Sequence, residues 1–389
     1  MKRFLCGVMF FVFCASFLLE GDTIMGAMPM DKALVSPMRA IQQIVLRLPI
    51  EQLEAFWQES KLVDQLPQDE NSSWPSGVPF RLVFTGDRNK VNFQLVMGSD
   101  PELSDAKIVP VSSRNFTLQN LEPGKTYYWK AQSVARASGE ITAESDAVHS
   151  FTVEDCGWRI MYVPKMWNVR DLGGKQAMNG LRIPYGRVYR SGGLNNNSND
   201  DGKTPGRSVL SDEGKSILRD LMKIRCEVDL RSDKETARMT ESPAGADVKY
   251  VHAEVGAYAG SLYKRGGMDA YCRMLRNFAD AENYPVIFHC IAGADRTGTT
   301  AFLLEALVGC SRDDIRRDYV YTSFHDVRRF EKIDELLEGL EKYGMPEEPL
   351  QYKTERFLLE CGLTKAEILA IQRNILGTDK FAVSPILKD

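Results

Sequence analysis

The stretch that most constrains this chain runs from residue 284 to residue 300 and reads YPVIFHCIAGADRTGTT. A short apolar run is followed by a loop that contains glycine, and then by the apolar, helix-favouring residues 301–307. This order predicts a buried strand that delivers a loop to the N-terminus of a helix. Unpaired backbone N–H groups point into such a loop and the helix dipole favours negative charge, so the stretch predicts an anion site.

Two side chains of this loop, Cys290 and Arg296, are separated by five residues. A thiol beside free amides and a guanidinium is pushed toward the thiolate, and the planar fork of Arg296 can hold two phosphoryl oxygens. That pair suits attack on a phosphate ester through a cysteinyl-phosphate. A lone cysteine is more often a small buried hydrophobe. However, His289, Ala292-Gly293 and the closing residues 295–298 favour phosphate binding over a structural loop.

At these residues the chain resembles the tyrosine-phosphatase superfamily, and it looks closest to the bacterial and fungal tyrosine/lipid phosphatases whose loop runs His-Cys-x-Ala-Gly-Lys-Asp-Arg-Thr-Gly. The likeness covers about residues 158–375. It extends to Asn168 through Gly174, Gly186 through Gly192, Val228 through Ser232, Asp314-Ile315 and Asp318-Tyr319. One departure is that the family's loop lysine is Ala294 here. The resemblance implies a metal-free, cofactor-free phosphatase with an α/β fold, in which helices flank a central sheet.

The site residues follow from the motif and the resemblance together. Cys290 is the predicted nucleophile, and Arg296 with the loop amides is expected to stabilise the phosphoryl oxygens. His289 is expected to bond backbone around the loop and to help set the thiolate rather than to act as a base. Thr297 could donate its hydroxyl to the departing sulfur. The predicted phosphate-binding loop comprises Ile291, Ala292, Gly293, Ala294, Asp295, Arg296 and Thr297.

A general acid must protonate the leaving oxygen. The resemblance points to Asp295, the alternative being that this carboxylate pairs with a neighbouring arginine for structure. Asp269 is the other candidate acid. The charged residues upstream are interpreted as scaffold pairs that order the loop: Asn168, Arg170, Asp171, Asp229 and Arg231.

The first 27 residues have the shape of a secretory signal peptide, with Lys2-Arg3 before the apolar run 4–19. Cleavage near Gly21 or Ala27 predicts a periplasmic or secreted protein, and an uncleaved signal would make it membrane-anchored. Of eight cysteines, six lie beyond this segment, without CxxC pairs or histidines at ligand spacing. A structural zinc site is therefore not expected, and most of these cysteines are expected to be buried free thiols.

Three further regions follow. Residues 35–66 show helical periodicity interrupted by Pro49, and we expect helices that pack on a neighbouring domain. Residues 79–154 alternate with period two and predict a β-sandwich. Leu121-x-Pro123-Gly124-x-x-Tyr127 resembles the tyrosine corner of fibronectin type III domains. The predicted catalytic domain, residues 158–380, alternates strands with helices and then becomes helical, which indicates a parallel sheet with sites beyond the strand C-termini.

The net charge of −4 gives no basic field and argues against nucleic acid as a partner. We therefore expect a phosphorylated protein or a small phosphate monoester as substrate, phosphotyrosine before a phosphoinositide or inositol phosphate. The alternative is a non-catalytic phosphate-binding protein in which the sandwich, a possible docking site for protein or glycan, is the working part.

Overall fold

The computed structural model describes residues 22–59, 73–195, 210–236 and 239–388. The chain divides into two compact units. Of the described residues, the first unit takes in 22–33, 79–117 and 126–152, and the second takes in the described parts of 34–78, 118–125 and 153–388. The apolar run at residues 4–19 lies outside the described residues. Among the helices of the described part, none has the length and apolar character needed to cross a bilayer.

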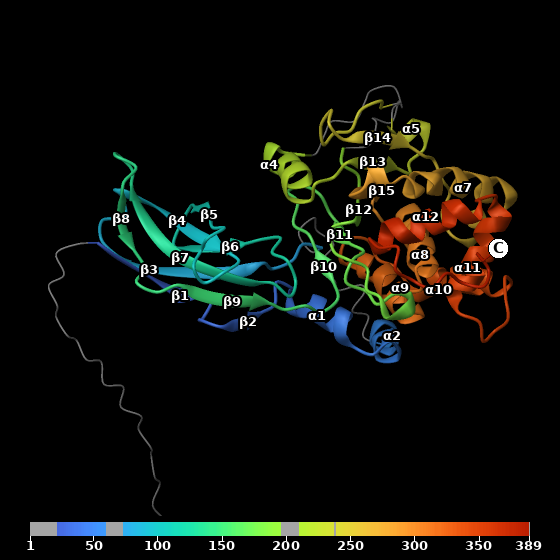
Figure 1. Cartoon of the computed structure of the whole chain (residues 1–389), viewed down its shortest axis with the longest axis horizontal. Coiled ribbons are helices and arrows are strands. Elements are labelled where there is room, and N and C mark those ends of the chain that lie inside the picture. Colours follow the sequence, from blue (N-terminus) through green and yellow to red (C-terminus); the bar gives the residue numbers. More distant parts are fainter. Residues whose placement is uncertain (1–21, 60–72, 196–209, 237–238, 389) are drawn as a thin grey trace, which may run out of the picture. The chain divides into compact units, whose positions relative to one another are not determined.

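The first unit consists of two β-sheets (Figure 1). One sheet has the order β1 (Thr23–Met28), β3 (Val78–Thr85), β6 (Asn115–Leu118). The other has the order β2 (Ala33–Val35), β9 (His149–Val153), β7 (Thr126–Ala135), β4 (Val91–Gly98), β5 (Lys107–Val111), with β8 (Ile141–Glu144) beside β7. The Phe80 ring of β3 packs edge-on against Trp129 of β7 and Phe151 of β9, with centroid distances of 5.1 and 5.6 Å. The all-β prediction for this region is confirmed, while its identity as a fibronectin type III domain stays a prediction.

The N-terminal boundary needs a correction. Strand β1 begins at Thr23, inside the stretch of 27 residues expected to stand outside the fold, and it pairs antiparallel with β3. Ile24 is buried in this strand. Small residues such as Gly26 and Ala27 suit a cleavage site and an edge strand equally, which is why the sequence misled. Cleavage at Ala27 would remove most of β1, whereas cleavage at Gly21 leaves the strand intact.

The second unit is built on a sheet with the order β10 (Arg159–Ile160), β11 (Arg170–Asp171), β12 (Val188–Ser191), β15 (Val286–His289), β13 (Cys226–Asp229), β14 (Lys249–His252). The last four strands are parallel, as the alternation of strands and helices predicts, and β10 and β11 are antiparallel at one edge. Both faces of β15 are covered. Val286 and Phe288 belong to a core shared with the C-terminal helices, and Ile287 belongs to a smaller core with Leu218 and Met222.

The helices that cover this sheet include short and long elements. The short ones are α4 (Asp212–Ser216), α5 (Asp233–Thr236) and α6 (Ala259–Leu262), with single turns at Met178–Gly180, Ile217–Leu221, Ala281–Asn283 and Thr322–Phe324. The long ones are α7 (Arg265–Ala279), α8 (Asp295–Leu307), α9 (Arg312–Tyr321), α10 (Phe330–Glu341), α11 (Leu350–Cys361) and α12 (Lys365–Leu376). Thr364 and Glu367 form the predicted capping box of α12. In Figure 1, α4 and the C-terminal helices lie on opposite sides of the sheet.

The predicted helical segment belongs to this second unit. It forms α1 (Ala40–Arg47) and α2 (Ile50–Glu59), separated at Pro49 as expected. The Arg317 guanidinium of α9 donates to the carbonyls of Val45 and Leu48, and the Trp57 indole donates to the carbonyl of Arg328 at 3.0 Å. The described part of the segment therefore packs within the same unit as the predicted catalytic domain rather than on a separate one, and residues 60–66 of the predicted segment lie outside the described residues. The unit therefore takes in residues well before the predicted start at residue 158.

Candidate active site

The loop predicted to bind phosphate joins β15 to α8, at the C-terminal edge of the parallel strands. Cys290 follows the last strand residue directly and is only 3% exposed. Gly293 turns the chain with φ +67°, and a Cβ there would lie 2.3 Å from the Ser191 carbonyl oxygen. Only glycine fits such a position. The Gly298 amide then donates to the Ala294 carbonyl at 2.7 Å, and the helix begins.

Donors around the Cys290 sulfur favour the thiolate. Burial works to raise the pKa of this thiol, but the Thr297 hydroxyl and amide, the Arg296 guanidinium and the Ala294 amide together hold the pKa below its usual range. The Thr297 hydroxyl is buried and has no oxygen or nitrogen partner among the described residues, so it is available to the sulfur. Cys290 thus has the environment of a reactive cysteine rather than that of an inert buried one.

The Arg296 guanidinium is oriented by Glu235, a residue that the sequence reasoning missed. Nη1 and Nη2 of Arg296 lie 2.6 and 2.9 Å from the two Glu235 carboxylate oxygens. Glu235 also accepts from the amide and hydroxyl of Ser232, each at 2.8 Å. Burial acts against ionisation, yet these donors lower the pKa of Glu235 to about 2. Glu235 thus holds both terminal nitrogens of Arg296, and no described residue hydrogen-bonds its Nε, which leaves Nε for a ligand. The Ser232-x-x-Glu235 spacing of a capping box predicts a helix start at this place, but it does not predict the contact with Arg296.

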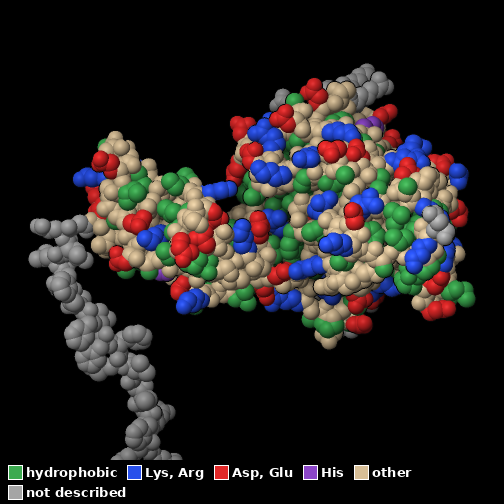
Figure 2. All heavy atoms as spheres, viewed as in Figure 1, with side chains coloured by type: hydrophobic (Ala, Val, Ile, Leu, Met, Phe, Trp, Pro, Cys, Tyr) green, Lys and Arg blue, Asp and Glu red, His purple; other side chains and the backbone are tan. Residues whose placement is uncertain are grey.

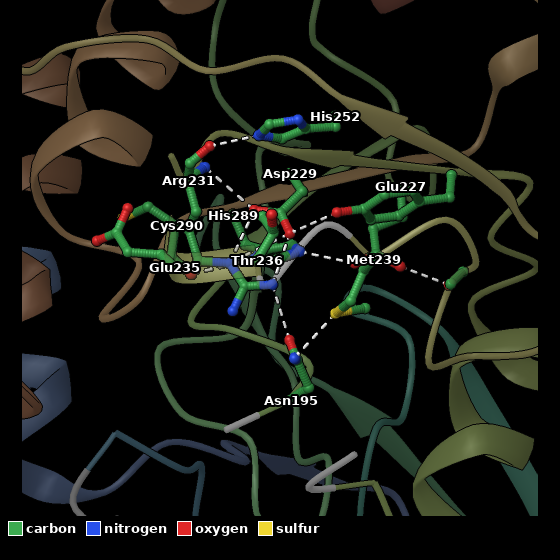
Figure 3. Close-up of polar contacts among 12 residues, drawn as sticks. Asn195, Glu227, Asp229, Arg231, Glu235, Thr236, Met239, His252, His289 and Cys290 are labelled. Atoms are coloured by element: carbon green, nitrogen blue, oxygen red, sulfur yellow. Dashed lines mark hydrogen bonds and ion pairs between the residues drawn. The ribbon is translucent and has the colours of Figure 1, made fainter. Parts of the chain in front are cut away.

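His289, the last residue of β15, is fully buried. It lies among the polar residues of Figure 3 and contacts Glu227 there. Its Nδ1 lies 3.0 Å from the Cys290 carbonyl, and its Nε2 lies 2.8 Å from Glu227. Burial disfavours the imidazolium, but Asp229 and Glu227 raise the pKa of His289 above its usual value. The side chain therefore bonds the loop backbone, as predicted, and the structure gives it a carboxylate partner that the sequence did not reveal.

A buried ion pair lies beside His289. Nη2 and Nε of Arg231 donate to Asp229, and Nη2 also donates to Asn195 at 2.8 Å (Figure 3). Burial opposes ionisation, but His289 and Arg231 lower the pKa of Asp229 to about 2. Glu227, Asp229 and His289 offer ligand atoms within 4.8 Å of one another. The Asp229 and Glu227 carboxylates already accept from donors of the protein, and both His289 nitrogens are engaged by the Cys290 carbonyl and by Glu227, so the set fits a scaffold better than a metal ion. Beyond Asn195, the polar segment 196–207, which the sequence suggests for a pocket rim, lies outside the described residues.

The loop carbonyls are also held in place. Nδ2 of Asn168 donates to the carbonyls of Gly293 and Ala292 at 2.9 and 3.3 Å, and Nη2 of Arg190 donates to Gly293 at 2.8 Å. Asp318 pairs with Arg170 at 2.8 Å and with Arg190. The scaffold interpretation of these residues agrees with this geometry. Asp171 likewise has a structural position, because it accepts from the amides of Gly173 and Gly186. Arg190 lies within the stretch Gly186 through Gly192, and the sequence did not reveal its contact with the loop.

The two candidate acids have different surroundings. Asp295 is the first residue of α8, and its side chain is 42% exposed. Its Oδ1 accepts from the Tyr258 hydroxyl and lies 2.7 Å from Nη2 of Arg328. Asp269 pairs with Arg265 within α7, at 3.2 Å. The structure therefore places Asp295 in the loop with Cys290 and Arg296. It also supplies the arginine partner that the structural alternative for Asp295 requires, so the role of Asp295 stays a prediction.

The family's loop lysine corresponds to Ala294, and the arginines that could replace its charge are paired with carboxylates. Ala294 is the N-cap residue of α8 and is 1% exposed. Arg316 and Arg328 are the two arginines that could supply a cation in place of this lysine. Arg316 pairs with Asp334 and Glu54 at 2.8 and 2.9 Å. Arg328 lies at the loop, but Asp295 and Asp326 share its Nη2 at 2.7 and 2.8 Å. Each of these two cations is thus neutralised by carboxylates.

Comparison with known proteins agrees with this geometry. A model described as the tyrosine phosphatase family matches residues 161–377. A protein of Cupriavidus necator that carries the provisional name tyrosine-protein phosphatase is 30% identical over 182 residues, which span 39% of this chain but only 59% of that protein. The triple specificity protein phosphatase PtpB of Mycobacterium tuberculosis is 26% identical over 272 residues, covering 58% of this chain and 92% of that protein.

Two solved structures are also similar over part of the chain. The core catalytic domain of the PP-IP phosphatase SIW14 from S. cerevisiae shares 17% identity with a TM-score of 0.25, over 38% of this chain and 77% of that chain. P. aeruginosa TpbA shares 16% identity with a TM-score of 0.24, over 43% and 89%. These scores are too low to support an argument, so the assignment rests on the family match. The chain belongs to the tyrosine phosphatase family.

Proposed function

We propose that this protein is a cysteine-dependent phosphatase that hydrolyses phosphate monoesters through a cysteinyl-phosphate intermediate. Phosphotyrosine is the substrate that we propose ahead of other monoesters. The observation that carries the proposal is the buried Cys290 thiol with its lowered pKa, in the loop between β15 and α8. A loop that only bound phosphate would have no use for a thiolate. The names of the relatives from C. necator and M. tuberculosis are consistent with this proposal.

The proposed reaction has two steps. The Cys290 thiolate attacks phosphorus and the ester P–O bond breaks, while Asp295 gives its proton to the leaving oxygen. A water molecule then attacks phosphorus and gives a proton to Asp295, and the S–P bond breaks to return the thiolate. Arg296 and the loop amides stabilise the phosphoryl oxygens in both steps. Thr297 stabilises the departing sulfur by the same hydroxyl that lowers the pKa of Cys290.

Hydrolysis of para-nitrophenyl phosphate by purified protein, with and without EDTA, tests the activity. We expect turnover that EDTA does not change. Cys290→Ser should abolish this turnover while binding of vanadate stays measurable. If the variant keeps more than about a tenth of the wild-type kcat, covalent catalysis by Cys290 is wrong, because losing a nucleophile costs far more. Vanadate binding without any turnover in the wild type would instead favour the non-catalytic alternative.

The substrate preference follows from the charges near the loop. A loop lysine could hold a second phosphate, and one charge-assisted contact is worth about 1.5–3 kcal/mol, or roughly ten- to a hundredfold in discrimination. Ala294 lacks that cation, and Arg316 and Arg328 are both paired with carboxylates. We therefore propose a bias toward singly phosphorylated substrates, phosphotyrosine-like before polyphosphoinositide.

The values of kcat/KM for a phosphotyrosyl peptide and for a bisphosphorylated phosphoinositide test this bias, in the wild type and in Ala294→Lys. The lysine should improve the phosphoinositide relative to the peptide. Because Ala294 is buried, the thermal midpoint must be measured alongside, since a lysine has to displace its neighbours. A wild-type preference for the phosphoinositide that the lysine leaves unchanged would contradict the proposal.

We also propose that the protein is exported, on the strength of the basic and apolar N-terminal segment. Docking of a protein or glycan through the sandwich is a second proposal, supported only by the pairing of such a module with an enzyme unit. Figure 2 shows Lys, Arg, Asp and Glu side chains interspersed over the visible face of the second unit, which fits a partner other than nucleic acid. Fusing residues 1–30 to a reporter that is active only outside the cytoplasm would test export, and an inactive fusion would contradict it.

A further inference from the structure

Three elements converge on the carboxylate of Asp295. Asp295 itself opens α8, Tyr258 precedes α6, and Arg328 precedes α10. The Tyr258 hydroxyl donates to Oδ1 of Asp295, and Nη2 of Arg328 lies 2.7 Å from the same oxygen. Within the described residues, no hydrogen bond joins the other oxygen, Oδ2, to a protein group. The carboxylate thus has one oxygen held by two donors, while the described residues give Oδ2 no hydrogen-bond partner.

Tyr258 is built into this position by unusual backbone geometry. Its φ is +65°, a conformation that is costly for a residue with a Cβ and that persists only where the surroundings enforce it. The enforcing contacts come from the first turns of α8. The Tyr258 amide donates to the Thr299 hydroxyl at 3.0 Å, and that hydroxyl donates to the Asp295 carbonyl at 2.9 Å. The backbone of Tyr258 therefore hydrogen-bonds to the same turn of α8 that carries Asp295, the residue that its side chain contacts.

The hydroxyl of Tyr258 is itself oriented. Tyr319 donates to it at 3.2 Å, so the proton of Tyr258 is directed toward Asp295. Burial and the Asp295 carboxylate raise the pKa of Tyr258, so the hydroxyl stays a donor across the physiological range. The Tyr271 hydroxyl fixes the preceding backbone by donating to the Gly256 carbonyl at 2.7 Å. The hydrogen bonds from Tyr319 to Tyr258 and from Tyr258 to Asp295 therefore share one donor direction, toward the carboxylate.

We propose that Tyr258 and Arg328 are positioning residues for Asp295: they hold Oδ1 and leave Oδ2 to carry the proton that passes to the leaving oxygen. This inference rests on the proposed function. As the ester P–O bond breaks, the Oδ2–H bond breaks and the leaving oxygen gains the proton. The negative charge left on the carboxylate is then stabilised at Oδ1 by the Tyr258 hydroxyl and the Arg328 guanidinium. Both contacts are stronger after proton transfer than before it, which is what a catalytic interaction requires.

The test compares two substrates that differ in their need for an acid. The leaving group of para-nitrophenyl phosphate departs with little protonation, whereas phenyl phosphate needs the proton. Tyr258→Phe should lower kcat/KM for phenyl phosphate about tenfold, the size expected for losing one hydrogen bond to a charged group. The same variant should change kcat/KM for para-nitrophenyl phosphate less than about threefold. Tyr263→Phe is the matched control. Its hydroxyl donates to the Leu336 carbonyl at 2.5 Å and does not contact Asp295.

A double-mutant cycle completes the test. In the Asp295→Asn background, Tyr258→Phe should cost phenyl phosphate nothing further, because both changes remove one function. Equal losses on the two substrates, or a further loss in the Asp295→Asn background, would overturn the proposal. If Tyr258→Phe proves unstable by its thermal midpoint, Arg328→Met removes the other Oδ1 donor and must show the same selective loss.

The outcomes separate this inference from the proposed function. Hydrolysis that does not depend on Cys290 would refute the proposed function itself. A second outcome would refute only the positioning role. In that outcome hydrolysis depends on Cys290 and Asp295, but the ratio of kcat/KM for phenyl phosphate to kcat/KM for para-nitrophenyl phosphate is the same in Tyr258→Phe as in the wild type.

Discussion

At the scale of single residues, the reactivity of Cys290 depends on donors from the first turn of α8. Burial alone would make this cysteine an inert thiol, as it does for Cys226, whose pKa it raises to about 12. Cys226 also lies on the sheet, in the strand next to β15. The difference between the two thiols is the set of amides, the hydroxyl and the guanidinium that face Cys290.

Thr297→Ala should therefore raise the pKa of the Cys290 thiol. At a pH below the pKa of this thiol, the rate of its alkylation by iodoacetamide should fall about tenfold, as expected for losing one hydrogen bond to a charged group. Thr300→Ala is the control, because it removes a second buried hydroxyl of α8, one that is not among the donors to Cys290. Equal alkylation rates in Thr297→Ala and the wild type would show that the hydroxyl does not stabilise the thiolate.

The ion pair between Glu235 and Arg296 predicts how the stability of the fold depends on pH. The folded-state pKa of Glu235 is about 2, below its ordinary value of 4.5. A carboxylate with a lowered pKa contributes stability that is fully present above about pH 4.5 and is lost as the pH falls toward 2. Glu235→Gln should lower the thermal midpoint at neutral pH, and the difference from the wild type should shrink as the pH falls through this window. A difference that stays constant from pH 7 to pH 3 would exclude the ion pair as its cause.

At the scale of elements, the loop between β15 and α8 is shaped by one glycine and by the groups behind it. Gly293→Ala would place a methyl carbon 2.3 Å from the Ser191 carbonyl oxygen and 2.7 Å from the Gly192 nitrogen. We expect destabilisation of more than about 1 kcal/mol and loss of vanadate binding, because the residue also has a positive φ. Gly266→Ala in α7, where a Cβ meets nothing within 4 Å, should be neutral or slightly stabilising. A fully active Gly293→Ala would refute this view of the loop.

The sequence predicted this element well, because strand, loop and helix are contiguous and their signals are local. Cys290, Arg296 and the glycine turn could all be read from adjacent residues. Glu235, Glu227 and Tyr258 could not, because each lies more than 35 positions from its partner in the chain, and only folding brings it there. Position 258 carries no local signal at all, since a tyrosine with positive φ is not a preference of its sequence.

At the scale of the whole molecule, the second unit includes α1 and α2, which a boundary at residue 158 would discard. The Trp57 side chain is buried in the core of this unit and donates to the Arg328 carbonyl. Trp57→Ala should cost about 3–5 kcal/mol of unfolding free energy, as large-to-small core substitutions do. Ile44→Ala, which truncates a 40% exposed residue of α1, should change it by less than about 0.5 kcal/mol. Denaturant unfolding measures both, and equal effects would contradict the assignment of α2 to this core.

The central claim, a covalent intermediate on Cys290, is tested most directly by trapping that intermediate. In Asp295→Asn, a substrate with a good leaving group should still phosphorylate Cys290, while attack by water lacks its base and slows. Acid quenching of this variant with radiolabelled para-nitrophenyl phosphate, followed by peptide mapping, should place the label on the peptide that contains Cys290. The label should be absent from the Cys290→Ser, Asp295→Asn double variant. Label on any other residue, or turnover by the wild type with no label ever trapped on Cys290, would contradict the account.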